Sequence, residues 1–339
     1  MKAAVIHEFG GPDVLRYEEV ATPKARPGHI VIRILATGVN RLEHYIREGS
    51  VLGLQFPHVL GSDAVGVVAE VGEGVAGFAI GERVVPMPGF PLSPSDTVEP
   101  ISAAPSYAIG GVVAWGTYAE FIEVPARWVL KDTTGLSPEE LATLPMVLVT
   151  AVRAVRTVGQ VKAGDHVLVH AGASGTGSMN LQIAKALGAR VATTVDSESK
   201  ARFAASLGAD LVIDVNERDF VSAVREWTAD RGVDVVIDNL GGTVLPRSLD
   251  AARVGGTVVA MGFVTGVDVT FHIRNFFFTH KRLLGTLMGD VADLEFGLDL
   301  VKQRKVRPLL DRSIPLSNAA EAHRLLSANQ VAGNIVLVP

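Results

Sequence analysis

The chain contains no cysteine among its 339 residues. This absence excludes disulfide bonds, thiolate nucleophiles and every zinc site built on thiolate ligands. Any metal site would have to consist of histidine and carboxylate side chains alone. The chain also lacks a strong excess of charge, since 31 basic and 36 acidic residues give a formal net charge of -5. The expected partner is therefore a small molecule, and neither a nucleic acid nor an anionic membrane.

Long apolar runs are absent as well. No stretch approaches the roughly 18 consecutive apolar residues of a membrane span, and the N-terminal MKAAVIHEFGG has too short an apolar run for a signal peptide. These features predict a protein that is cytoplasmic and has no membrane partner. The length and the hydrophobic content of 48% suit two domains of ordinary size, each with its own core.

Up to about residue 125 the sequence consists of short β-like runs interrupted by glycine and proline, such as HIVIRILATGV and TYAEFIEVP. This pattern predicts a barrel-like or partly open β domain. Within it, residues 86–111 contain six prolines and little hydrophobic periodicity. We expect this segment to form a long surface loop or lobe.

From about residue 165, short β-branched runs alternate with segments of helical periodicity. The six runs are HVLVH, RVATTV, DLVID, VDVVID, TVVAMG and RLLGTLM. Six strands with intervening helices predict a doubly wound parallel sheet made of two βαβαβ halves. The segment SMNLQIAKALGA is predicted to be the first of these helices. The C-terminal helix-like NAAEAHRLLSAN and the strand GNIVLVP are expected to return to the N-terminal domain.

The turn between the first of these strands and its helix is rich in small residues. It consists of Gly172, Ala173, Ser174, Gly175, Thr176 and Gly177. This order fits the dinucleotide pattern G-x-G-x-x-G, with serine in place of the middle glycine. Small residues let the backbone approach a pyrophosphate at the positive end of the helix. Such turns also occur without a ligand, but the six-strand pattern around this one favours a nucleotide site.

Two other strand ends support this site. The fourth and fifth strands end in DNLGG and AMGF, which bring Asn239, Gly262 and Phe263 into consideration. Ligands of doubly wound sheets bind outside the carboxyl ends of the strands, so we expect these residues to contact the nucleotide.

The choice of nucleotide depends on the second strand, which ends in TTVDSESK. Asp196 would accept a hydrogen bond from a ribose 2′-hydroxyl and favour NAD. Ser197 and Lys200 would instead hold a 2′-phosphate and favour NADP. A helix cap is the plain structural alternative for Asp196 or Ser197, and a solvated first turn for Lys200.

These features together resemble the medium-chain dehydrogenase/reductase superfamily over essentially the whole chain. The resemblance is strongest for its metal-free quinone oxidoreductase and enoyl reductase branch. The segment GVNRLEHYIREG is similar to that branch's GVNxxDxYxRxG, with Asn40, Tyr45, Arg47 and Gly49 at matching positions and Glu43 in place of the aspartate. The segments LGSDAVGVVAEVGEGVAGFAIGERV, GTYAEFIEVP and LPMVLVTAVRAV are further similar signatures.

The resemblance implies a fold of class α/β. Residues 1–128 and 287–339 would form a GroES-like, partly open β-barrel catalytic domain. Residues 129–286 would form a Rossmann domain with a doubly wound, parallel six-stranded sheet. The resemblance also implies a homodimer whose sheets join edge to edge through strands like TVVAMG. In the run IRNFFFTHKR, Phe276, Phe277 and Phe278 would either wall a substrate cleft or serve as core and interface residues.

Both zinc sites of the superfamily's alcohol dehydrogenase branch are missing by the same comparison. Asn40 and Ser62 stand where that branch has a cysteine and a histidine ligand, and Leu42 replaces its proton-relay hydroxyl. Residues 86–111 correspond to the lobe that holds four structural cysteines there. One alternative is a rebuilt zinc site, which the spacing of its candidate ligands does not favour. The candidate ligands are Glu43, His44, His58 and Asp63.

Without a Lewis acid, simple alcohols become poor substrates. Reduction of an activated C=C bond is easier, because hydride adds to the β-carbon while charge collects on a carbonyl oxygen that needs only a hydrogen-bond donor. The resemblance therefore implies a zinc-independent, NAD(P)H-dependent reductase of quinones or of conjugated enones and enals. Asn40 would be an amide donor, Tyr45 a donor or proton source, and Glu43 would orient its neighbours. A helix cap at Asn40 and a packed aromatic at Tyr45 are the structural alternatives.

On the cofactor side, the resemblance gives Thr150 of LVTAVRAV a position near the nicotinamide. NADPH is the expected cofactor in preference to NADH. The branch's tyrosine after the third strand and its basic residue before the last strand are both missing, since those regions read VIDV and NQVAGN. Asn334, which ends the second of these segments, is kept as a candidate nucleotide contact. Two other functions stay open: an alcohol or carbonyl dehydrogenase of the same superfamily, and a nucleotide-binding structural or sensor protein without efficient catalysis.

Overall fold

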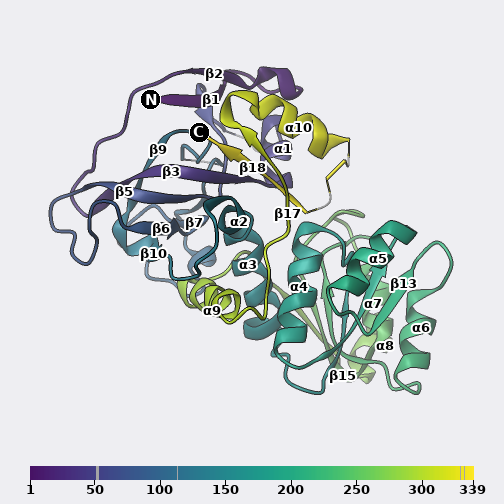
Figure 1. The fold of residues 1–339 in the computed structure, drawn as a ribbon. Helices are drawn as coiled ribbons and strands as arrows, with labels where there is room; N and C mark the ends of the chain where they lie inside the picture. The colour runs from purple at the N-terminus through teal and green to yellow at the C-terminus, as the bar shows by residue number, and fades with distance from the viewer. Residues whose placement is uncertain (51–52, 113, 329, 332) are drawn as a thin grey trace. The chain divides into compact units, whose positions relative to one another are not determined.

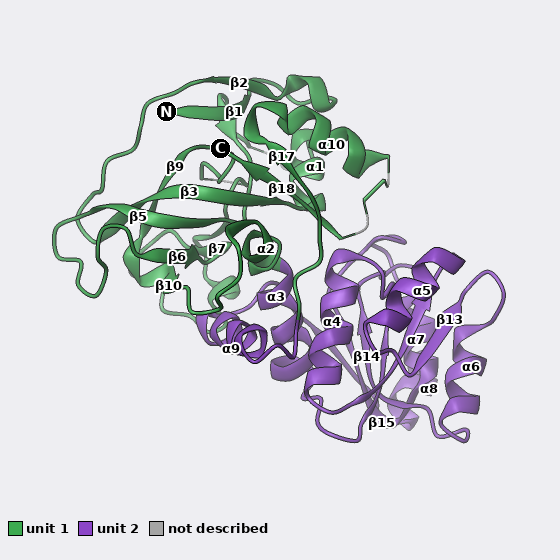
Figure 2. Ribbon diagram, in the orientation of Figure 1, with its two compact units in different colours: residues 1–146, 307–339 green, residues 147–306 purple. Residues whose placement is uncertain are grey.

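The computed structural model describes residues 1–50, 53–112, 114–328, 330–331 and 333–339. The chain divides into two compact units, the first comprising Met1–Met146 and Arg307–Pro339 and the second Val147–Val306 (Figure 2). From the sequence we expected the Rossmann domain to end at residue 286. In the structure the second unit also includes α9 (Val291–Lys302), where Gly297 packs against Leu148. Among the described residues, none of the helices has the length and apolar character needed to cross a membrane.

The first unit is built around β3 (His29–Val39), a long strand with partners on several sides (Figure 1). It pairs antiparallel with β5 (Val65–Val71), β9 (Phe121–Pro125) and β18 (Asn334–Val338). The pairing with β18 confirms that the C-terminal segment returns to this unit. The other strands of this sheet are β6 (Arg83–Pro86), β10 (Val129–Lys131) and β17 (Leu310–Pro315).

The apolar alternation of β3 explains its central place. Ile30 and Ile32 point into one core with Val68, Val84 and Val124, since alternate residues of a strand share a face. The unit also contains a separate three-stranded sheet. Its strands are β1 (Lys2–Ile6), β2 (Arg16–Glu19) and β4 (His58–Val59). The helices of the unit are α1 (Arg41–Arg47), α2 (Pro138–Ala142) and α10 (Ala319–Ser327), and α3 (Pro145–Val152) begins at its boundary.

The proline-rich segment 86–111 is more ordered than the loop predicted from its sequence. Within it, β7 (Gly89–Pro91) pairs antiparallel with β8 (Tyr107–Ile109) to form a separate two-stranded sheet. A 3-10 turn at Ile101–Ala103 precedes β8. We refer to residues 86–111 as the proline-rich lobe.

The second unit contains the predicted doubly wound sheet. Its six strands are all parallel and run in the order β13-β12-β11-β14-β15-β16, which confirms the prediction of two βαβαβ halves. The strands are β11 (His166–Val169), β12 (Arg190–Val195), β13 (Leu211–Asp214), β14 (Val233–Asp238), β15 (Ala252–Ala260) and β16 (Arg282–Gly285). The helices are α4 (Gly175–Ala186), α5 (Glu198–Ser206), α6 (Phe220–Trp227), α7 (Leu245–Ala251), α8 (Ile273–Phe278) and α9, with a π-helical segment at Arg153–Val158.

The sheet order corrects one expectation about assembly. The strand TVVAMG belongs to β15, which lies between β14 and β16 and so has no open edge. The outer strands of this sheet are β13 and β16. The sequence pattern gives the number of strands but does not show which of them lies at the edge, and that is why the expectation was wrong.

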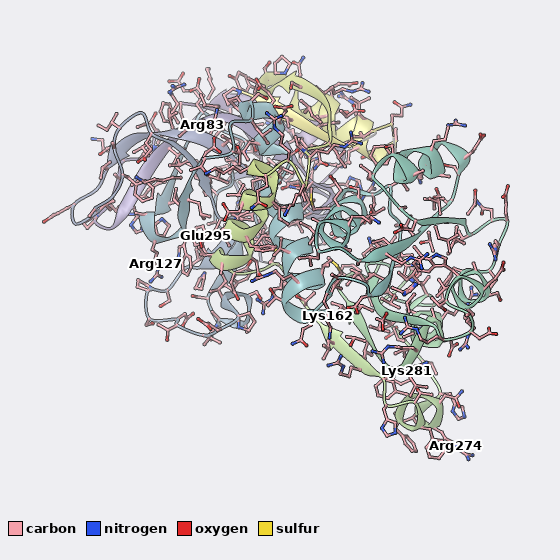
Figure 3. The ribbon with its side chains drawn as sticks, turned by 60° about the horizontal axis from the view of Figure 1, so that its bottom comes forward. Arg83, Arg127, Lys162, Arg274, Lys281 and Glu295 are labelled. Carbon is pink, nitrogen blue, oxygen red and sulfur yellow. The ribbon has the colours of Figure 1, made fainter. Side chains whose placement is uncertain are left out.

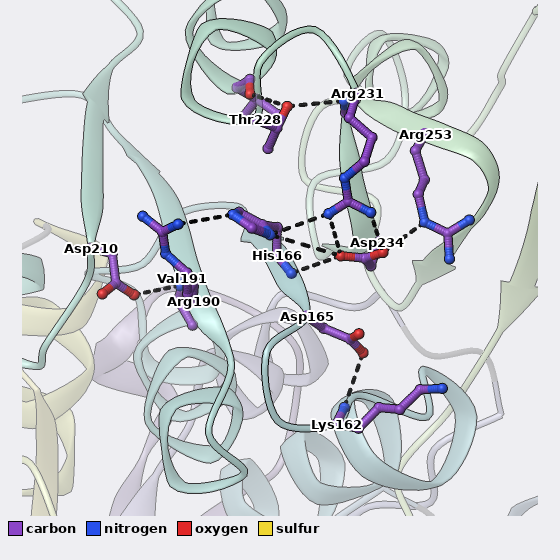
Figure 4. Close-up of polar contacts among 12 residues, drawn as sticks. Lys162, Asp165, His166, Arg190, Val191, Asp210, Thr228, Arg231, Asp234 and Arg253 are labelled. Atoms are coloured by element: carbon purple, nitrogen blue, oxygen red, sulfur yellow. Dashed lines mark hydrogen bonds and ion pairs between the residues drawn. The ribbon is translucent and has the colours of Figure 1, made fainter.

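The carboxylate of Asp234 links the N-terminal ends of three strands of this sheet (Figure 4). Asp234 at the beginning of β14 accepts hydrogen bonds from the His166 N–H at 2.8 Å, from Arg231 and from Arg253 Nε at 2.6 Å. Partial burial opposes ionisation of Asp234, but these donors hold its pKa well below the ordinary value. Asp234 thus links the starts of β11, β14 and β15 as a carboxylate.

Candidate functional site

The start of α1 in the first unit carries a buried polar cluster, which we call the α1 cluster and define as Asn40, Glu43, Ser62 and Asp63. Asn40 is the N-cap of α1 and its N–H donates to Glu43 Oε2 at 2.8 Å. The structural alternative considered for Asn40, a helix cap, is therefore present. Glu43 and Asp63 are completely buried, and Asn40 and Ser62 are nearly so.

The amide of Asn40 is fixed by its neighbours. Its Nδ2 donates to Asp63 Oδ2 at 2.8 Å and to Ser62 Oγ at 3.3 Å. Asp63 Oδ1 accepts the N–H of Met146 at 2.7 Å. Both hydrogens of the amide are thus used within the α1 cluster, so donation to a substrate carbonyl requires one of these bonds to be exchanged. The expected donor role of Asn40 stays a prediction.

Ser62 connects the two halves of the α1 cluster. Its Oγ donates to Glu43 Oε1 at 2.7 Å, and its N–H donates to the same oxygen at 3.1 Å. The sequence indicated Ser62 only as the replacement for a zinc ligand and gave it no role. The local sequence LGSD does not predict the contact of Ser62 with Glu43, which lies 19 residues earlier in the chain.

Burial changes the acidity of both carboxyl groups. It raises the pKa of Glu43 to about 7, against the hydrogen bonds from Ser62 and Asn40 that favour the ionised form. Burial also raises the pKa of Asp63 to about 7, again against its hydrogen bonds from Asn40 and Met146. Two acids that titrate near neutral pH and lie in hydrogen-bond contact with an amide and a hydroxyl can hold and release protons.

Tyr45 differs from the rest of the predicted catalytic set because it is 38% exposed. Its ring lies 5.5 Å from the ring of His44. His44 in turn accepts from Arg47 Nη2 at 3.0 Å, an arrangement that fixes the imidazole on the helix surface. Tyr45 is therefore on the accessible side of α1, whereas Asn40 and Glu43 are enclosed.

The residues of the α1 cluster do not fit zinc. Asn40 and Ser62 are poor zinc ligands, and both are engaged in hydrogen bonds to carboxylates. Over the residues that the structure describes, no three histidine, aspartate or glutamate side chains converge on a point where a metal would be held. His58 Nε2, for example, lies 2.9 Å from the carbonyl oxygen of Gly111.

The second unit contains the predicted nucleotide turn. Ser174 caps α4, since its Oγ accepts the N–H of Gly177 at 3.1 Å. A Cβ on Gly172 would collide with Thr193 Oγ1, and one on Gly177 would collide with the Ala171 carbonyl oxygen. Gly172 therefore lets the turn pack against β12, and Gly177 lets the backbone of the turn pack closely against Ala171. The helix α4, which begins at Gly175, has 12 residues and an N-terminus that suits a pyrophosphate.

The ends of β14 and β15 meet closely beside this turn. A Cβ on Gly262 would collide with the Asn239 carbonyl oxygen, so the two strand ends are in backbone contact. Asn180 of α4 donates to Met261 Sδ at 3.5 Å, which links the helix to the end of β15. Within the described part of the chain, Asn239 Oδ1 is buried without a hydrogen-bond partner, and Phe263 is 65% exposed. An orphaned acceptor and an exposed ring at this edge suit contacts with a nucleotide.

The residues considered for nucleotide choice form a local pair. Lys200 Nζ lies 2.7 Å from Oδ1 of Asp196, which precedes α5 and is four residues earlier in the chain, and both side chains are more than half exposed. Asn216 donates to the Asp196 carbonyl oxygen at 2.8 Å, while Ser197 Oγ contacts Ser199 Oγ at 3.3 Å. A 2′-phosphate would compete with Asp196 for Lys200, whereas a ribose hydroxyl would leave the pair intact.

The two remaining nucleotide candidates lie in different units. Thr150 is in the second unit, where its Oγ1 is 3.7 Å from Met288 Sδ. Asn334 is in the first unit as the first residue of β18, and its N–H donates to the Leu309 carbonyl oxygen at 2.7 Å. Neither role is tested by these contacts, and both stay predictions.

A buried network behind the nucleotide turn was not predicted. His170 contacts Thr194 Oγ1 at 3.1 Å through Nδ1 and Ser248 Oγ at 2.9 Å through Nε2. Ser248 donates to Asp238 Oδ2 at 2.7 Å, so the serine accepts from the histidine. Burial lowers the pKa of His170 to about 4, and the ring is neutral with its proton on Nε2. The network fixes the ends of β11, β12 and β14.

The phenylalanine run divides between core and surface. Phe276 packs on the core of the second unit, with its ring 5.5 Å from that of Phe271. Phe277 and Phe278 are 53% and 60% exposed. Figure 3 shows Arg274, from the same helix, and Lys281 at one extremity of this unit. The core alternative therefore holds for Phe276, while the other two rings are available for a contact.

Comparison with known proteins places the chain among oxidoreductases. The family model for the alcohol dehydrogenase GroES-like domain matches residues 26–134, and that for zinc-binding dehydrogenases matches residues 175–303. A 2-haloacrylate reductase from Burkholderia sp. is 34% identical over 99% of this chain and 98% of its own length. A quinone oxidoreductase from Rattus norvegicus is 29% identical over 100% of the chain and 98% of its own. The crystal structure of an NAD-dependent alcohol dehydrogenase superposes with a TM-score of 0.93 at 35% identity, with 100% of both chains covered.

Proposed function

Because the chain belongs to the medium-chain dehydrogenase/reductase superfamily, in its quinone oxidoreductase and enoyl reductase-like branch, we propose that it transfers hydride from NAD(P)H to an activated C=C bond or a quinone without zinc. Its GroES-like domain and parallel Rossmann sheet are those of this superfamily. The observation that carries the proposal is the α1 cluster, in which an amide and a hydroxyl are hydrogen-bonded to carboxyl groups. By the resemblance, these two residues stand where the alcohol dehydrogenase branch has two zinc ligands.

The chemistry of the α1 cluster supports this choice of substrate. Oxidation of a simple alcohol needs a group that strongly acidifies the hydroxyl, which zinc supplies in related enzymes. Asn40 and Ser62 cannot supply it. A conjugated acceptor instead needs hydrogen-bond donors at the oxygen that collects charge and a proton afterwards. The exposed hydroxyl of Tyr45 and the acids of the α1 cluster can provide these.

The nucleotide would be held in the second unit. The pyrophosphate would lie at the N-terminus of α4, against the turn Gly172–Gly177, and Asn239, Gly262 and Phe263 would contact its nicotinamide half. When bound, the reduced nicotinamide supplies the hydride. The residues of this unit bind and orient it. Asn239 Oδ1, which has no partner among the described residues, would gain one such as an amide N–H.

We assign a preference for NADPH, on the basis of Lys200 and Ser197. The 2′-phosphate would take Lys200 from Asp196, and it would also meet the hydroxyl of Ser197. Replacing Lys200 with alanine should therefore raise KM for NADPH about tenfold and leave KM for NADH nearly unchanged. Equal effects on the two nucleotides would contradict the preference.

A homodimer is also part of the proposal. The outer strand β16 and the exposed rings of Phe277 and Phe278 offer an unpaired edge beside apolar surface on the second unit. Light scattering coupled to size exclusion should give twice the chain mass of 35.8 kDa. A monomer at micromolar concentration would reject this part.

The direct test is nucleotide oxidation by purified protein whose metal content has been measured. NADPH and NADH are each compared with quinones, enals, enones, 2-haloacrylate and plain ketones as acceptors. Turnover of conjugated acceptors by metal-free protein is the expected result. Turnover confined to alcohols or ketones would indicate the alternative function, that of an alcohol dehydrogenase. The similar NAD-dependent alcohol dehydrogenase structure makes this the alternative to test. Tight nucleotide binding without turnover would indicate the non-catalytic alternative.

A further inference from the structure

The first unit contains a pocket whose lining joins the proline-rich lobe to the α1 cluster. It has a volume of about 50 Å³, which suits the reacting end of a small molecule. Its walls are mostly apolar. Residues that line it include Ser62, Phe90, Ile109, Trp115, Thr117 and Ile122. Residues of the lobe, whose exact role the sequence left open, thus line the same pocket as Ser62.

The hydroxyl and carboxyl side chains that line this pocket are not equivalent. Glu123 is paired with Arg26, with Nε 2.8 Å from its Oε1. The hydroxyl of Thr117 donates to the Asp63 carbonyl oxygen at 2.8 Å. The hydroxyl of Ser62, in contrast, contacts a buried acid, at 2.7 Å from Glu43 Oε1. Because Ser62 lines this pocket and also contacts Glu43, its hydroxyl is the candidate link between the acid and the pocket.

The environment of Glu43 limits the other paths. The carboxylate is completely buried. It accepts hydrogen bonds from the hydroxyl of Ser62 and from the main-chain N–H groups of Ser62 and Asn40. A main-chain N–H does not pass a proton on, whereas a hydroxyl can accept one on its oxygen and give up its own hydrogen. Of these contacts, the hydroxyl of Ser62 is the connection suited to proton transfer.

We propose that Ser62 is a catalytic residue that passes a proton from Glu43 to a reduced substrate in this pocket. This inference rests on the proposed function. Hydride from NAD(P)H brings two electrons to the β-carbon and leaves an enolate or hydroquinone anion. The Ser62 O–H bond breaks as a C–H or O–H bond forms on the anion, and the proton of Glu43 moves to Ser62 Oγ. Glu43 remains as a carboxylate and regains its proton from water after product release.

The surrounding charges favour this use of Glu43. Burial, with a smaller contribution from the Asp63 carboxylate, raises the pKa of Glu43 to about 7, so part of the acid is protonated at neutral pH and can yield its proton. Among the described residues, Glu43 and Arg47 both act on Tyr118, whose pKa burial raises well above the ordinary value. Arg47 donates to His323 Nδ1 at 3.2 Å, and burial lowers the pKa of His323 to about 3. Neither Tyr118 nor His323 titrates near neutral pH.

The test compares Ser62→Ala, Ser62→Thr and Glu43→Gln with the wild-type protein, using NADPH and a conjugated acceptor that the wild type reduces. Ser62→Ala should lower kcat about a hundredfold with little change in KM, and Ser62→Thr, which keeps the hydroxyl, should recover most of it. The fall in wild-type kcat as pH rises through about 7 should be absent in Glu43→Gln. Ser95→Ala, on the exposed part of the lobe, is the matched control and should behave as the wild type.

Wild-type kcat in Ser62→Ala, or an unchanged pH profile in Glu43→Gln, would overturn the relay while leaving the proposed function standing. Absence of wild-type turnover with every conjugated acceptor would overturn the proposed function. A measurement without turnover tests the relay independently. The 13C signal of the Glu43 carboxyl, assigned by its loss in Glu43→Gln, should titrate with a midpoint near pH 7. This midpoint should move to higher pH in Ser62→Ala. A titration midpoint at the ordinary pKa of glutamate, or the same midpoint in Ser62→Ala as in the wild type, would contradict the relay.

Discussion

The side chains at the start of α1 show how burial changes the chemistry of ordinary residues. Glu43 and Asp63 would be ionised at neutral pH in water, but enclosure raises the pKa of each to about 7. Asn40 and Ser62 supply the hydrogen bonds that make the enclosed carboxylates tolerable. The same bonds occupy both N–H groups of Asn40, so among the predicted catalytic residues Tyr45 is the accessible donor.

We predict that Tyr45→Phe lowers kcat/KM for a conjugated acceptor about tenfold or more, because the substrate oxygen loses a donor. The free energy of unfolding should hardly change, since the tyrosine is 38% exposed. Steady-state kinetics and urea unfolding measure the two quantities. Tyr17→Phe, at a site 41% exposed in β2, should alter neither. Unchanged kinetics in Tyr45→Phe would indicate that the ring has a packing role only.

The raised pKa values also predict how stability depends on pH. The folded pKa of Glu43 is above its unfolded value, so its contribution to stability is full below about pH 4 and is lost as pH rises through about 7. The wild-type protein should therefore lose up to about 3 kcal/mol from this group between about pH 4 and about pH 8. Glu43→Gln cannot ionise and should lose less over the same range. Thermal unfolding at several pH values tests this, and parallel curves for the two proteins would contradict it.

Among the elements of the fold, the connection between β11 and α4 depends on glycines for two reasons. Gly172 has no room for a side chain, because a Cβ would collide with Thr193 Oγ1. The small turn also exposes the N-terminus of α4, where Ser174 satisfies one N–H and others remain for a phosphate. Packing and binding therefore favour the same residues, and the fingerprint alone does not separate the two.

We predict that Gly172→Ala weakens nucleotide binding more than about tenfold and lowers the melting temperature, because Thr193 and the turn must both move. Binding is measured by quenching of protein fluorescence and stability by thermal unfolding. Gly11→Ala in the first unit is the control, since a Cβ there meets no atom of the described residues within 4 Å. If Gly172→Ala bound nucleotide like the wild type, the turn would not be the phosphate site.

In the molecule as a whole, two compact units share one chain, and the second depends on ion pairs at the start of its sheet. Asp234 joins β11, β14 and β15 through donors from His166, Arg231 and Arg253 (Figure 4). Partial burial opposes ionisation of Asp234, yet these donors keep its pKa well below the ordinary value. Its contribution is thus present above about pH 4 and is lost as pH falls through the lower folded value.

We predict that Asp234→Asn lowers the free energy of unfolding of the second unit by about 2 kcal/mol at pH 7, since charged hydrogen bonds are lost. The difference from the wild type should narrow below about pH 4. Urea unfolding at neutral pH and at about pH 3, followed by a probe in the second unit such as Trp227, measures both values. Asp250→Asn, at an exposed position of α7, is the control. A difference that persists unchanged in acid would assign the loss to packing instead of charge.

Much of the architecture could be predicted from periodicity. The β-branched runs from HVLVH to RLLGTLM each form a strand, because their neighbours along the chain already favour extended, buried backbone. The pattern could not show that β15 lies inside the sheet or that β7 and β8 pair within the proline-rich lobe. Those outcomes depend on which strands meet, and local sequence does not encode the partner of a strand.

Residue identity and near-neighbour spacing are enough to reveal the resemblance to the family, the absence of thiolate ligands and the location of the glycine turn. They do not reveal that Ser62 meets Glu43, that Asp63 accepts from Met146 83 residues later, or that both acids are enclosed. The acidity of a carboxyl group depends on the water and donors around it. In this protein those donors come from segments far apart in the chain, which only folding brings together.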